Sequence, residues 1–249
     1  MRYFIHLSYQ GTAFHGWQKQ INANTVQAEI ESGLSKILRT PIEIYGSSRT
    51  DTGVHAAQQF AHFNLDKPLE NSSKLVYSVN KMLPIGIAIK DIQAMPPDAH
   101  ARFDATHRCY QYHILKYKNP FLNALAYTFG SNLDLEQMNK ACEILKQHID
   151  FQAFSKYNTE VKTFDCTIEY AYWTSTEEST FFHIKANRFL RGMVRAIVGT
   201  MIEIGMGRMS LEAFVAIIQS KNRKNASRAA PAQGLTLIEV GYPKNYFLN

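Results

Sequence analysis

Residues 47–56 hold the side chains of this chain that are best suited to chemistry. The stretch reads SSRTDTGVHA and places Arg49 two residues before Asp51, with Gly53 two residues further on. A carboxylate can act as a nucleophile or as a general base, and a neighbouring guanidinium favours its charged form. Apolar, strand-like residues flank the stretch, so we expect its polar side chains in a loop that connects two strands. An aspartate that only closes its own turn is the alternative interpretation.

Asp51, Thr52 and Gly53 also form the triplet of the aspartic proteases, in which two aspartates share one proton. The chain contains one copy of this triplet, and polar residues precede it where a protease has an apolar strand. The positive charge of Arg49 would also oppose proton sharing. An aspartic protease is therefore disfavoured.

The composition is that of a basic protein with a substantial core. The chain has 249 residues, 45% of them hydrophobic, and 27 Lys and Arg against 21 Asp and Glu give a formal net charge of +6. These values disfavour general disorder and favour a polyanionic partner such as nucleic acid. The apolar runs are too short to cross a bilayer, and the N-terminus lacks a signal-peptide core. We expect a cytoplasmic protein with no membrane partner.

The cysteines and histidines do not follow a metal-binding pattern. Cys109, Cys142 and Cys166 share no close spacing, which disfavours a zinc ribbon and a disulfide framework and favours buried thiols in a reducing compartment. None of the nine histidines falls into HxxxH or HxH spacing. We therefore expect no metal site.

Periodicity predicts an α+β protein. Alternating apolar residues predict strands at residues 3–9, 42–45, 60–63, 85–94, 107–116, 164–173, 181–186 and 235–242. Helical spacing predicts helices at residues 24–37, 75–82, 134–145, 188–205 and 210–218. Strands that are adjacent in sequence, with helices between pairs of them, predict mainly antiparallel sheets that helices cover on one face.

The pattern partly repeats after Pro96 and Pro97, which predicts two similar halves. We expect an N-terminal domain at residues 1–103, which carries the Asp51 loop, and a C-terminal domain at residues 104–249. Each sheet would leave one face free, so we expect the active-site cleft between the two halves.

The Asp51 loop and five further segments resemble the tRNA pseudouridine synthase A family. RTDTGVHA is similar to the family signature, and the other matches are YQGTAFHGWQ, TVQAEIE, ARFDATHRCYQY, FLRGMVRAIVG and APAQGLTL. The resemblance implies an isomerase without a cofactor that converts uridines 38–40 of the tRNA anticodon stem-loop to pseudouridine. It also implies a homodimer in which one RNA contacts both subunits. Ser48 stands where the family usually has glycine, so the backbone there must suit a residue with a Cβ.

The resemblance implies catalytic roles for three residues. Asp51 would be the nucleophile or the base on a sugar proton, and either role needs an ionised carboxylate. Arg49 would favour that charge and fill the gap left by a flipped nucleotide. Tyr110 would be the stacking platform for the target base. Alternation alone favours a core aromatic instead, because Tyr110, Tyr112 and Ile114 share one strand face.

Basic residues are the candidates for contacts with RNA. Arg188, Arg191 and Arg195 fall at i, i+3 and i+7, which predicts a basic stripe on the helix opposite its apolar face. A solvated helix face is the alternative interpretation of this stripe. The resemblance implies a site role for Arg195, and we expect Arg188 and Arg191 to contact phosphates. The further substrate-binding candidates are Arg102, Lys19 and His55, and for His55 a hydrogen bond to the loop backbone is the alternative to a phosphate contact.

A non-catalytic RNA-binding module, whose sheet faces would stack bases, is the other class to consider. The K/R-G-F/Y-G/A-F pattern that would support it is absent from the sequence. The sequence therefore favours the enzyme.

Overall fold

Alternating apolar side chains make β1 (Arg2–Tyr9) the central strand of the first half of the chain. The computed structural model describes residues 1–156 and 161–247. In it, β1 pairs antiparallel with β3 (His55–Asn64) and with β4 (Ile87–Met95). The short β2 (Tyr45–Gly46) pairs with β3. The strand order β4-β1-β3-β2 is that of a split βαβ unit.

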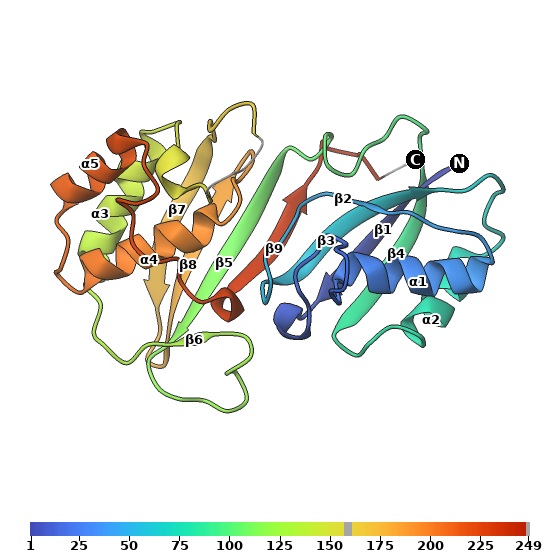
Figure 1. Cartoon of the computed structure of the whole chain (residues 1–249), viewed down its shortest axis with the longest axis horizontal. Coiled ribbons are helices and arrows are strands. Elements are labelled where there is room, and N and C mark those ends of the chain that lie inside the picture. Colours follow the sequence, from blue (N-terminus) through green and yellow to red (C-terminus); the bar gives the residue numbers. More distant parts are fainter. Residues whose placement is uncertain (157–160, 248–249) are drawn as a thin grey trace. The chain divides into compact units, whose positions relative to one another are not determined.

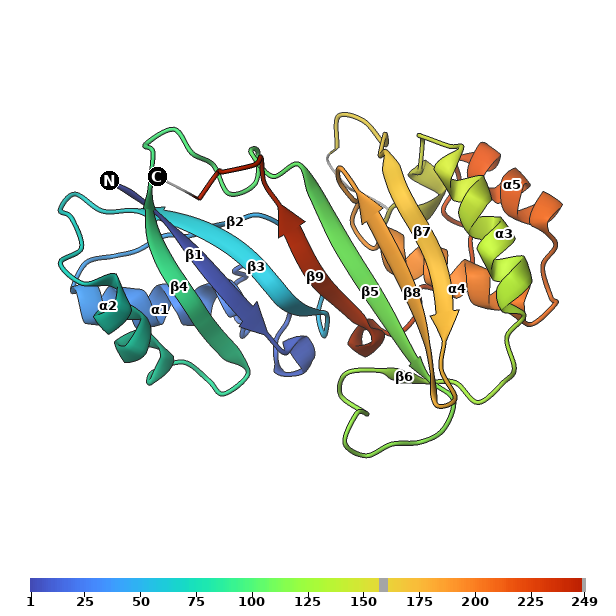
Figure 2. The same ribbon diagram turned by 180° about the vertical axis from the view of Figure 1, so that it is seen from behind.

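Two helices, α1 (Val26–Leu38) and α2 (Ser72–Asn80), pack on each other and cover one face of this sheet (Figures 1 and 2). The N-cap of α1 is Thr25, whose side chain accepts a hydrogen bond from Ala28 N. The sequence placed this start at Asn24, one residue too early. Threonine and asparagine are both good N-caps, so the local sequence does not show which of Thr25 and Asn24 caps the helix.

The C-terminal strand returns to the first half. The chain forms two compact units, Met1–Thr106 with Leu237–Asn249, and His107–Thr236. From Leu237 on, β9 (Leu235–Gly241) belongs to the first unit, where Val240 N donates to Gln58 Oε1. The expected range 104–249 assigns this strand to the other half. That residues 1–103 and 104–249 are two domains, each able to fold by itself, stays a prediction.

The second unit has a sheet of three long strands in the order β5 (His107–Leu115), β8 (Ser179–Ala186) and β7 (Ile168–Ser175), and both pairs are antiparallel. The short β6 (Tyr127–Thr128) lies parallel to β5. The helices are α3 (Leu135–Lys146), α4 (Met193–Gly205) and α5 (Leu211–Ser220). Single-turn 3-10 helices cover Gly11–Ala13, Gln152–Phe154 and Ala232–Gly234. No helix within the described ranges has the length and apolar character to span a membrane.

The start of α4 corrects the sequence analysis. Gly192 is its N-cap, with a φ of 72°, and the helix begins at Met193. Arg188 and Arg191 therefore precede the helix, and the predicted helical stripe through Arg188, Arg191 and Arg195 is wrong. A residue in the left-handed conformation interrupts the helical path that the apolar spacing had suggested. Most of α4 is buried, so it also lacks the solvated face that was the alternative.

Both units repeat one order of elements, which confirms two similar α+β halves with mainly antiparallel sheets. Apart from the short β6, each runs strand, helix, strand, strand, helix, and the third of these strands pairs with the first and with the second. The units differ at the connection between their second and third strands. In the second unit it is a tight turn, where Thr176 N donates to Ser179 O. In the first unit it is the longer loop at residues 47–54, which contains Asp51. The cleft expected between the halves stays a prediction.

Candidate active site

The Asp51 loop closes by a backbone turn. Asp51 O accepts a hydrogen bond from Val54 N at 3.1 Å. Gly53 has a φ of 79°, the conformation that the third residue of a type II turn requires. The turn thus uses the main chain of Asp51, whose side chain is half-buried. Closing a turn and presenting a reactive carboxylate are therefore compatible roles for this residue.

Residues 9–17, here called segment 9–17, hold the loop at Thr50. The hydroxyls of Tyr9 and Thr50 are hydrogen-bonded at 2.8 Å in a buried position. Trp17 N donates to Thr50 O at 3.2 Å, so both the side chain and the carbonyl of Thr50 are bound. The segment continues from β1, which lies inside the sheet. The residue before Asp51 is thus fixed to the centre of the first unit.

Two glycines of segment 9–17 allow its backbone to touch the loop. A Cβ at Gly16 would lie 2.5 Å from Thr50 O, and the φ of Gly16 is 88°. A Cβ at Gly11 would lie 1.9 Å from Val54 O. These positions need glycine because two backbones meet there with no room for a side chain. Both residues lie in a segment that carries the resemblance, but periodicity and spacing do not predict this role, nor the roles of Tyr9 and Thr50.

His55 is the first residue of β3 and is 2% exposed. Its Nδ1 accepts a hydrogen bond from Gly11 N at 2.9 Å. The geometry is that of the structural alternative, a side chain that fastens the end of the loop to segment 9–17.

Ser48 fits its position without backbone strain. Its φ is not positive, so the Cβ that replaces the expected glycine meets no conformational penalty. Ser48 O accepts from Gln59 Nε2 at 2.9 Å, and Ser47 Oγ is hydrogen-bonded to Gln59 Oε1. The start of the loop is therefore held to β3 through Gln59.

Arg49 and Arg102 are exposed side chains of the first unit. Within the described ranges Arg49 has neither an ion-pair nor a hydrogen-bond partner, so it makes no direct contact with the Asp51 carboxylate. The guanidinium of Arg102 lies 5.6 Å from the centre of the Phe103 ring, which is itself 74% exposed. Both side chains are accessible to an anion from solution.

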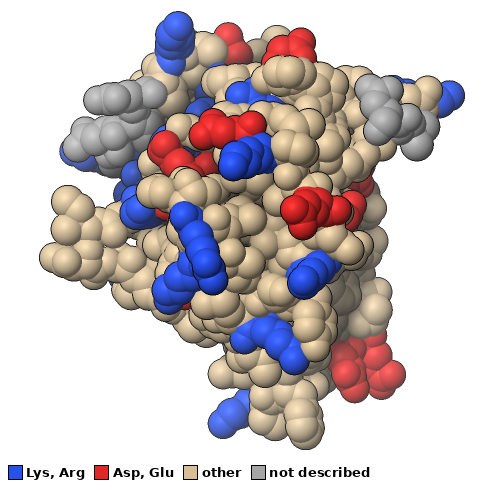
Figure 3. All heavy atoms as spheres, turned by 90° about the vertical axis from the view of Figure 1, so that its right-hand side faces the viewer, with Lys and Arg blue, Asp and Glu red and all other residues tan. Residues whose placement is uncertain are grey.

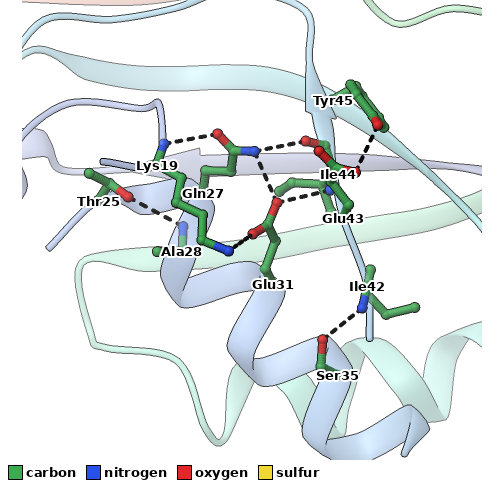
Figure 4. A network of polar contacts seen from close by, with 10 residues as sticks. All are labelled: Lys19, Thr25, Gln27, Ala28, Glu31, Ser35, Ile42, Glu43, Ile44 and Tyr45. Carbon is green, nitrogen blue, oxygen red and sulfur yellow. Dashed lines mark hydrogen bonds and ion pairs between the residues drawn. The ribbon is translucent and has the colours of Figure 1, made fainter. Parts of the chain in front are cut away.

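Lys19 takes part in a network that joins α1 to the chain before β2 (Figure 4). Lys19 Nζ lies 3.0 Å from Glu31 Oε2, and Lys19 N donates to Gln27 Oε1. Glu31 Oε1 accepts from Gln27 Nε2 and from Ile44 N. The predicted RNA-binding lysine therefore has a structural partner, although its own side chain is 64% exposed.

Tyr110 and Tyr112 point to the buried face of β5, as alternation predicts. Tyr110 is 7% exposed and packs edge-on against Phe189, with ring centres 5.1 Å apart and an interplanar angle of 90°. The Tyr112 hydroxyl donates to Pro231 O at 2.7 Å. Burial raises the pKa of Tyr112 above its usual value, so its hydroxyl stays protonated.

Arg195 ties α4 to the segment before β9. Its Nε donates to Ala230 O at 2.7 Å, and Ala230 N donates to Arg195 O at 2.9 Å. A Cβ at Gly199 would lie 1.9 Å from Arg228 O, so the two segments are in backbone contact there as well. The structure thus brings together FLRGMVRAIVG and APAQGLTL, which are distant in sequence.

Arg188 and Arg191 lie in the chain that leads into α4. Arg188 is half-buried and Arg191 is exposed. Arg191 O accepts from Lys156 N at 2.9 Å, which fixes the backbone at this position.

The three cysteines are buried thiols that form no disulfide. Burial raises the pKa of Cys142 to about 12 and that of Cys166 to about 11. Both stay protonated near neutral pH, and a thiol must lose its proton to bind a metal or act as a nucleophile. The expected absence of a metal site stays a prediction.

The candidate residues fall into one group in each unit. The first unit carries Lys19, Arg49, Asp51, His55 and Arg102, and the second carries Tyr110, Arg188, Arg191 and Arg195. Segment 9–17 joins the Asp51 loop to His55, and its end is joined to Lys19 through the network of α1. On the face in Figure 3, basic and acidic side chains are interspersed among uncharged ones. The net charge of +6 does not form one continuous basic patch on that face.

Comparison with known proteins gives one family. The family model described as tRNA pseudouridine synthase matches residues 6–104 and 141–243. Three similar proteins carry the name tRNA pseudouridine synthase A. That of Parabacteroides distasonis is 46% identical over 246 residues, 99% of this chain and 98% of its own. That of Bacteroides thetaiotaomicron is 44% identical over 249 residues (99% and 92%), and that of Acetivibrio thermocellus is 39% identical over 240 residues (95% and 97%).

Proposed function

The chain belongs to the tRNA pseudouridine synthase family, a family of isomerases, and on that premise we propose that it converts uridines 38–40 of the tRNA anticodon arm to pseudouridine. Asp51 is the reacting carboxylate in this proposal. The observation that carries it is the placement of Asp51 in the family signature, on a loop that is bound on both sides of the aspartate.

The reaction moves one bond of the nucleotide. The bond from uracil N1 to the ribose C1′ breaks, the base turns, and C5 bonds to C1′. C5 loses a proton and N1 gains one, so the atoms balance without redox change or hydrolysis. The proposal therefore needs no cofactor or metal. Asp51 acts either as the nucleophile or as the base on a sugar proton, and both routes start from its ionised form.

A bound loop suits this chemistry. A reacting group that is held in position avoids the entropy loss of reaching the reactive geometry, and small misplacements are costly in rate. The turn from Asp51 to Val54 and the two hydrogen bonds of Thr50 provide this support.

We propose supporting roles for two further residues. Exposed Arg49 fills the space left by the flipped nucleotide. Tyr110 stacks on the target base, and the edge-on contact with Phe189 fixes the plane of its ring.

The basic residues bind the RNA backbone in this proposal. Shape and phosphate contacts carry most of the recognition of a folded RNA. Arg191 and Arg102 are suited to phosphates because they are exposed. The remaining candidates are Arg188, Arg195, Lys19 and His55.

We also propose that the enzyme works as a cytoplasmic homodimer, with one tRNA in contact with both subunits. Exposed apolar side chains after β5 support an interface: Tyr117 is 71% exposed and Phe121 is 91% exposed. Large apolar side chains that are exposed in one chain can be covered by association with another. A molar mass in solution equal to that of one chain without tRNA, and to that of one chain plus one tRNA in its presence, would remove the homodimer from the proposal.

The function is tested by mapping pseudouridine in unmodified tRNA after incubation with the protein, without added cofactor or metal. Wild type should modify the anticodon arm, and Asp51→Asn should bind the tRNA without modifying it. Asp66→Asn makes the same change at an exposed acid outside the site and should behave as wild type. Tight binding by wild type with every uridine unchanged would support the non-catalytic RNA-binding module instead.

Phosphate contacts are tested by the salt dependence of tRNA binding. The binding constant falls as salt rises, and each lost contact makes the slope of log K against log salt less steep by about 0.7 to 0.9. Arg191→Gln should weaken binding and reduce the slope by about one contact. The control is Lys140→Gln, because Lys140 is already paired with Glu136 at 2.7 Å on α3. Equal slopes for Arg191→Gln and wild type would exclude Arg191 as a phosphate contact.

A further inference from the structure

Tyr9 is a buried residue to which the sequence analysis gave no function. It ends β1, is 4% exposed, and its hydroxyl lies 2.8 Å from Thr50 Oγ1. Thr50 is 9% exposed and directly precedes Asp51. A hydroxyl pair buried beside a reactive loop can have a structural role or a positioning role. The contacts of Thr50 favour the positioning role.

The bond from Tyr9 acts on the backbone next to Asp51. Thr50 is held at its side chain by Tyr9 and at its carbonyl by Trp17 N. With both groups bound, Thr50 cannot rotate about its Cα–C bond without breaking one of them. That rotation decides where the Cβ of the following residue points. On the other side, the hydrogen bond from Val54 N holds Asp51 O.

Tyr9 itself is held rigidly. It pairs with Ala56 of β3 and with Ile87 of β4, so its backbone is bonded on both sides. The pairing of β1 with β3 shifts by one residue between Leu7 and Tyr9. Such a bulge redirects the side chains that follow it, and bulges are frequent next to active sites. The Trp17 ring packs 6.0 Å from the Tyr9 ring.

We propose that the Tyr9 hydroxyl is a positioning group for Asp51, which acts through Thr50. The inference rests on the proposed function of Asp51 as the reacting carboxylate. Tyr9 does not take part in bond making or breaking. Its hydrogen bond keeps the carboxylate aimed at the ribose, so it contributes to the rate of the chemical step and not to the binding of tRNA.

The test uses two conservative changes and their combination. Tyr9→Phe removes the hydroxyl and keeps the ring, and Thr50→Val removes its partner while keeping the shape. Thr50→Ser keeps the hydroxyl and should keep the rate. The control is Tyr3→Phe. Tyr3 lies on the same strand, is also 4% exposed, and its hydroxyl accepts from Leu69 N at 2.9 Å.

The inference predicts a split between kcat and KM. Tyr9→Phe and Thr50→Val should each lower kcat by about tenfold or more, because misplacement of a reacting group is costly, and KM should stay within about twofold. The double variant should lose no more than either single variant, since both remove the same bond. Tyr3→Phe should keep the wild-type kcat. Thermal melting checks that Tyr9→Phe and Tyr3→Phe lose similar stability.

Two results would overturn the inference: a kcat for Tyr9→Phe equal to that of Tyr3→Phe, or losses in the double variant that add. If Tyr9→Phe does not fold, equal kcat values for Thr50→Ser and Thr50→Val would overturn it as well. Asp51→Asn is measured in parallel. Activity in that variant would contradict the proposed function, whereas an inactive Asp51→Asn with a fully active Tyr9→Phe would contradict this inference alone.

Discussion

At the scale of single residues, Glu31 fastens α1 to the chain that leads to the Asp51 loop. It is 5% exposed, and its carboxylate accepts from Ile44 N at 3.1 Å and from Gln27 Nε2 at 2.9 Å (Figure 4). Lys19 completes the set with an ion pair at 3.0 Å. The hydrogen bond from Ile44 N and the ion pair with Lys19 contribute differently to stability, because Ile44 N is buried and the Lys19 side chain is 64% exposed.

Glu31→Leu should lower the free energy of unfolding by about 2–3 kcal/mol, because a buried backbone donor loses its acceptor. Lys19→Met should lower it by less, about 1 kcal/mol, because the Lys19 side chain is exposed and Glu31 keeps its hydrogen bonds from Gln27 and Ile44. Urea unfolding of both variants measures the difference. Equal losses would mean that the ion pair, and not the hydrogen bond to Ile44 N, holds this junction.

At the scale of elements, the support of the Asp51 loop depends on backbone contact between the loop and segment 9–17. Gly16 is one of the two contact points, and it combines a φ of 88° with a Cβ position 2.5 Å from Thr50 O. Gly207 provides a comparison, because its φ is 70° and a Cβ there would meet nothing within 4 Å. The two positions share the backbone conformation and differ in the contact.

Gly207→Ala should therefore cost about 1 kcal/mol of stability, from the left-handed conformation alone. Gly16→Ala should cost more than about 2 kcal/mol, because the methyl group displaces backbone as well. It should also lower pseudouridine formation in the part of the protein that remains folded, whereas Gly207→Ala should not. Similar stability and similar activity for the two variants would contradict the contact at Gly16.

The sequence predicted those elements whose ends carry a local signal. Asp134 and Ser210 are the N-caps of α3 and α5, and their side chains accept from Gln137 N and Ala213 N. Alternation located β1, β4, β5 and β8 to within a few residues. Caps and alternation depend on neighbours in the chain, so a single sequence reveals them.

The errors arose where distant contacts override the local pattern. Apolar spacing extended α4 back to Arg188, but Gly192 adopts a positive φ and the helix starts after it. The loop residues of the site were located through the resemblance. The supporting contacts of Tyr9, Thr50 and Gly16 were not, because they join residues about 40 positions apart in a loop geometry that periodicity does not describe.

At the scale of the whole molecule, one arrangement of elements occurs twice and only one copy carries the Asp51 loop. The second unit has a tight turn at the equivalent connection. A loop on a rigid scaffold can acquire reactive residues while the scaffold keeps its core. The candidate catalytic loop therefore belongs to the first unit alone.

Buried histidines make the stability of the molecule depend on pH. Burial, together with the nearby charges of His100 and Arg2, lowers the pKa of His62 to about 4. The unfolded chain therefore binds this proton below about pH 6.5, whereas the folded chain resists it until about pH 4. Stability should be complete above about pH 6.5 and should fall as the pH drops toward 4, by up to about 3 kcal/mol for this residue.

His62→Gln should flatten this decline, because glutamine has no charge to gain and still offers an acceptor to Ala101 N. The control is His15→Gln, a change at an exposed side chain, which should keep the wild-type decline. Urea unfolding between pH 4 and 7.5 measures both. A decline in His62→Gln as steep as that of wild type would contradict the role of His62.

The central claim is that Asp51 drives the exchange of a C–N bond for a C–C bond at uridine. Because that exchange removes the hydrogen at C5, tRNA made with tritium at uracil C5 releases tritium to water only when pseudouridine forms. We expect steady release by the wild-type protein without cofactor or metal, and none above background by Asp51→Asn at the same bound fraction of tRNA. Release by Asp51→Asn at the wild-type rate would contradict it.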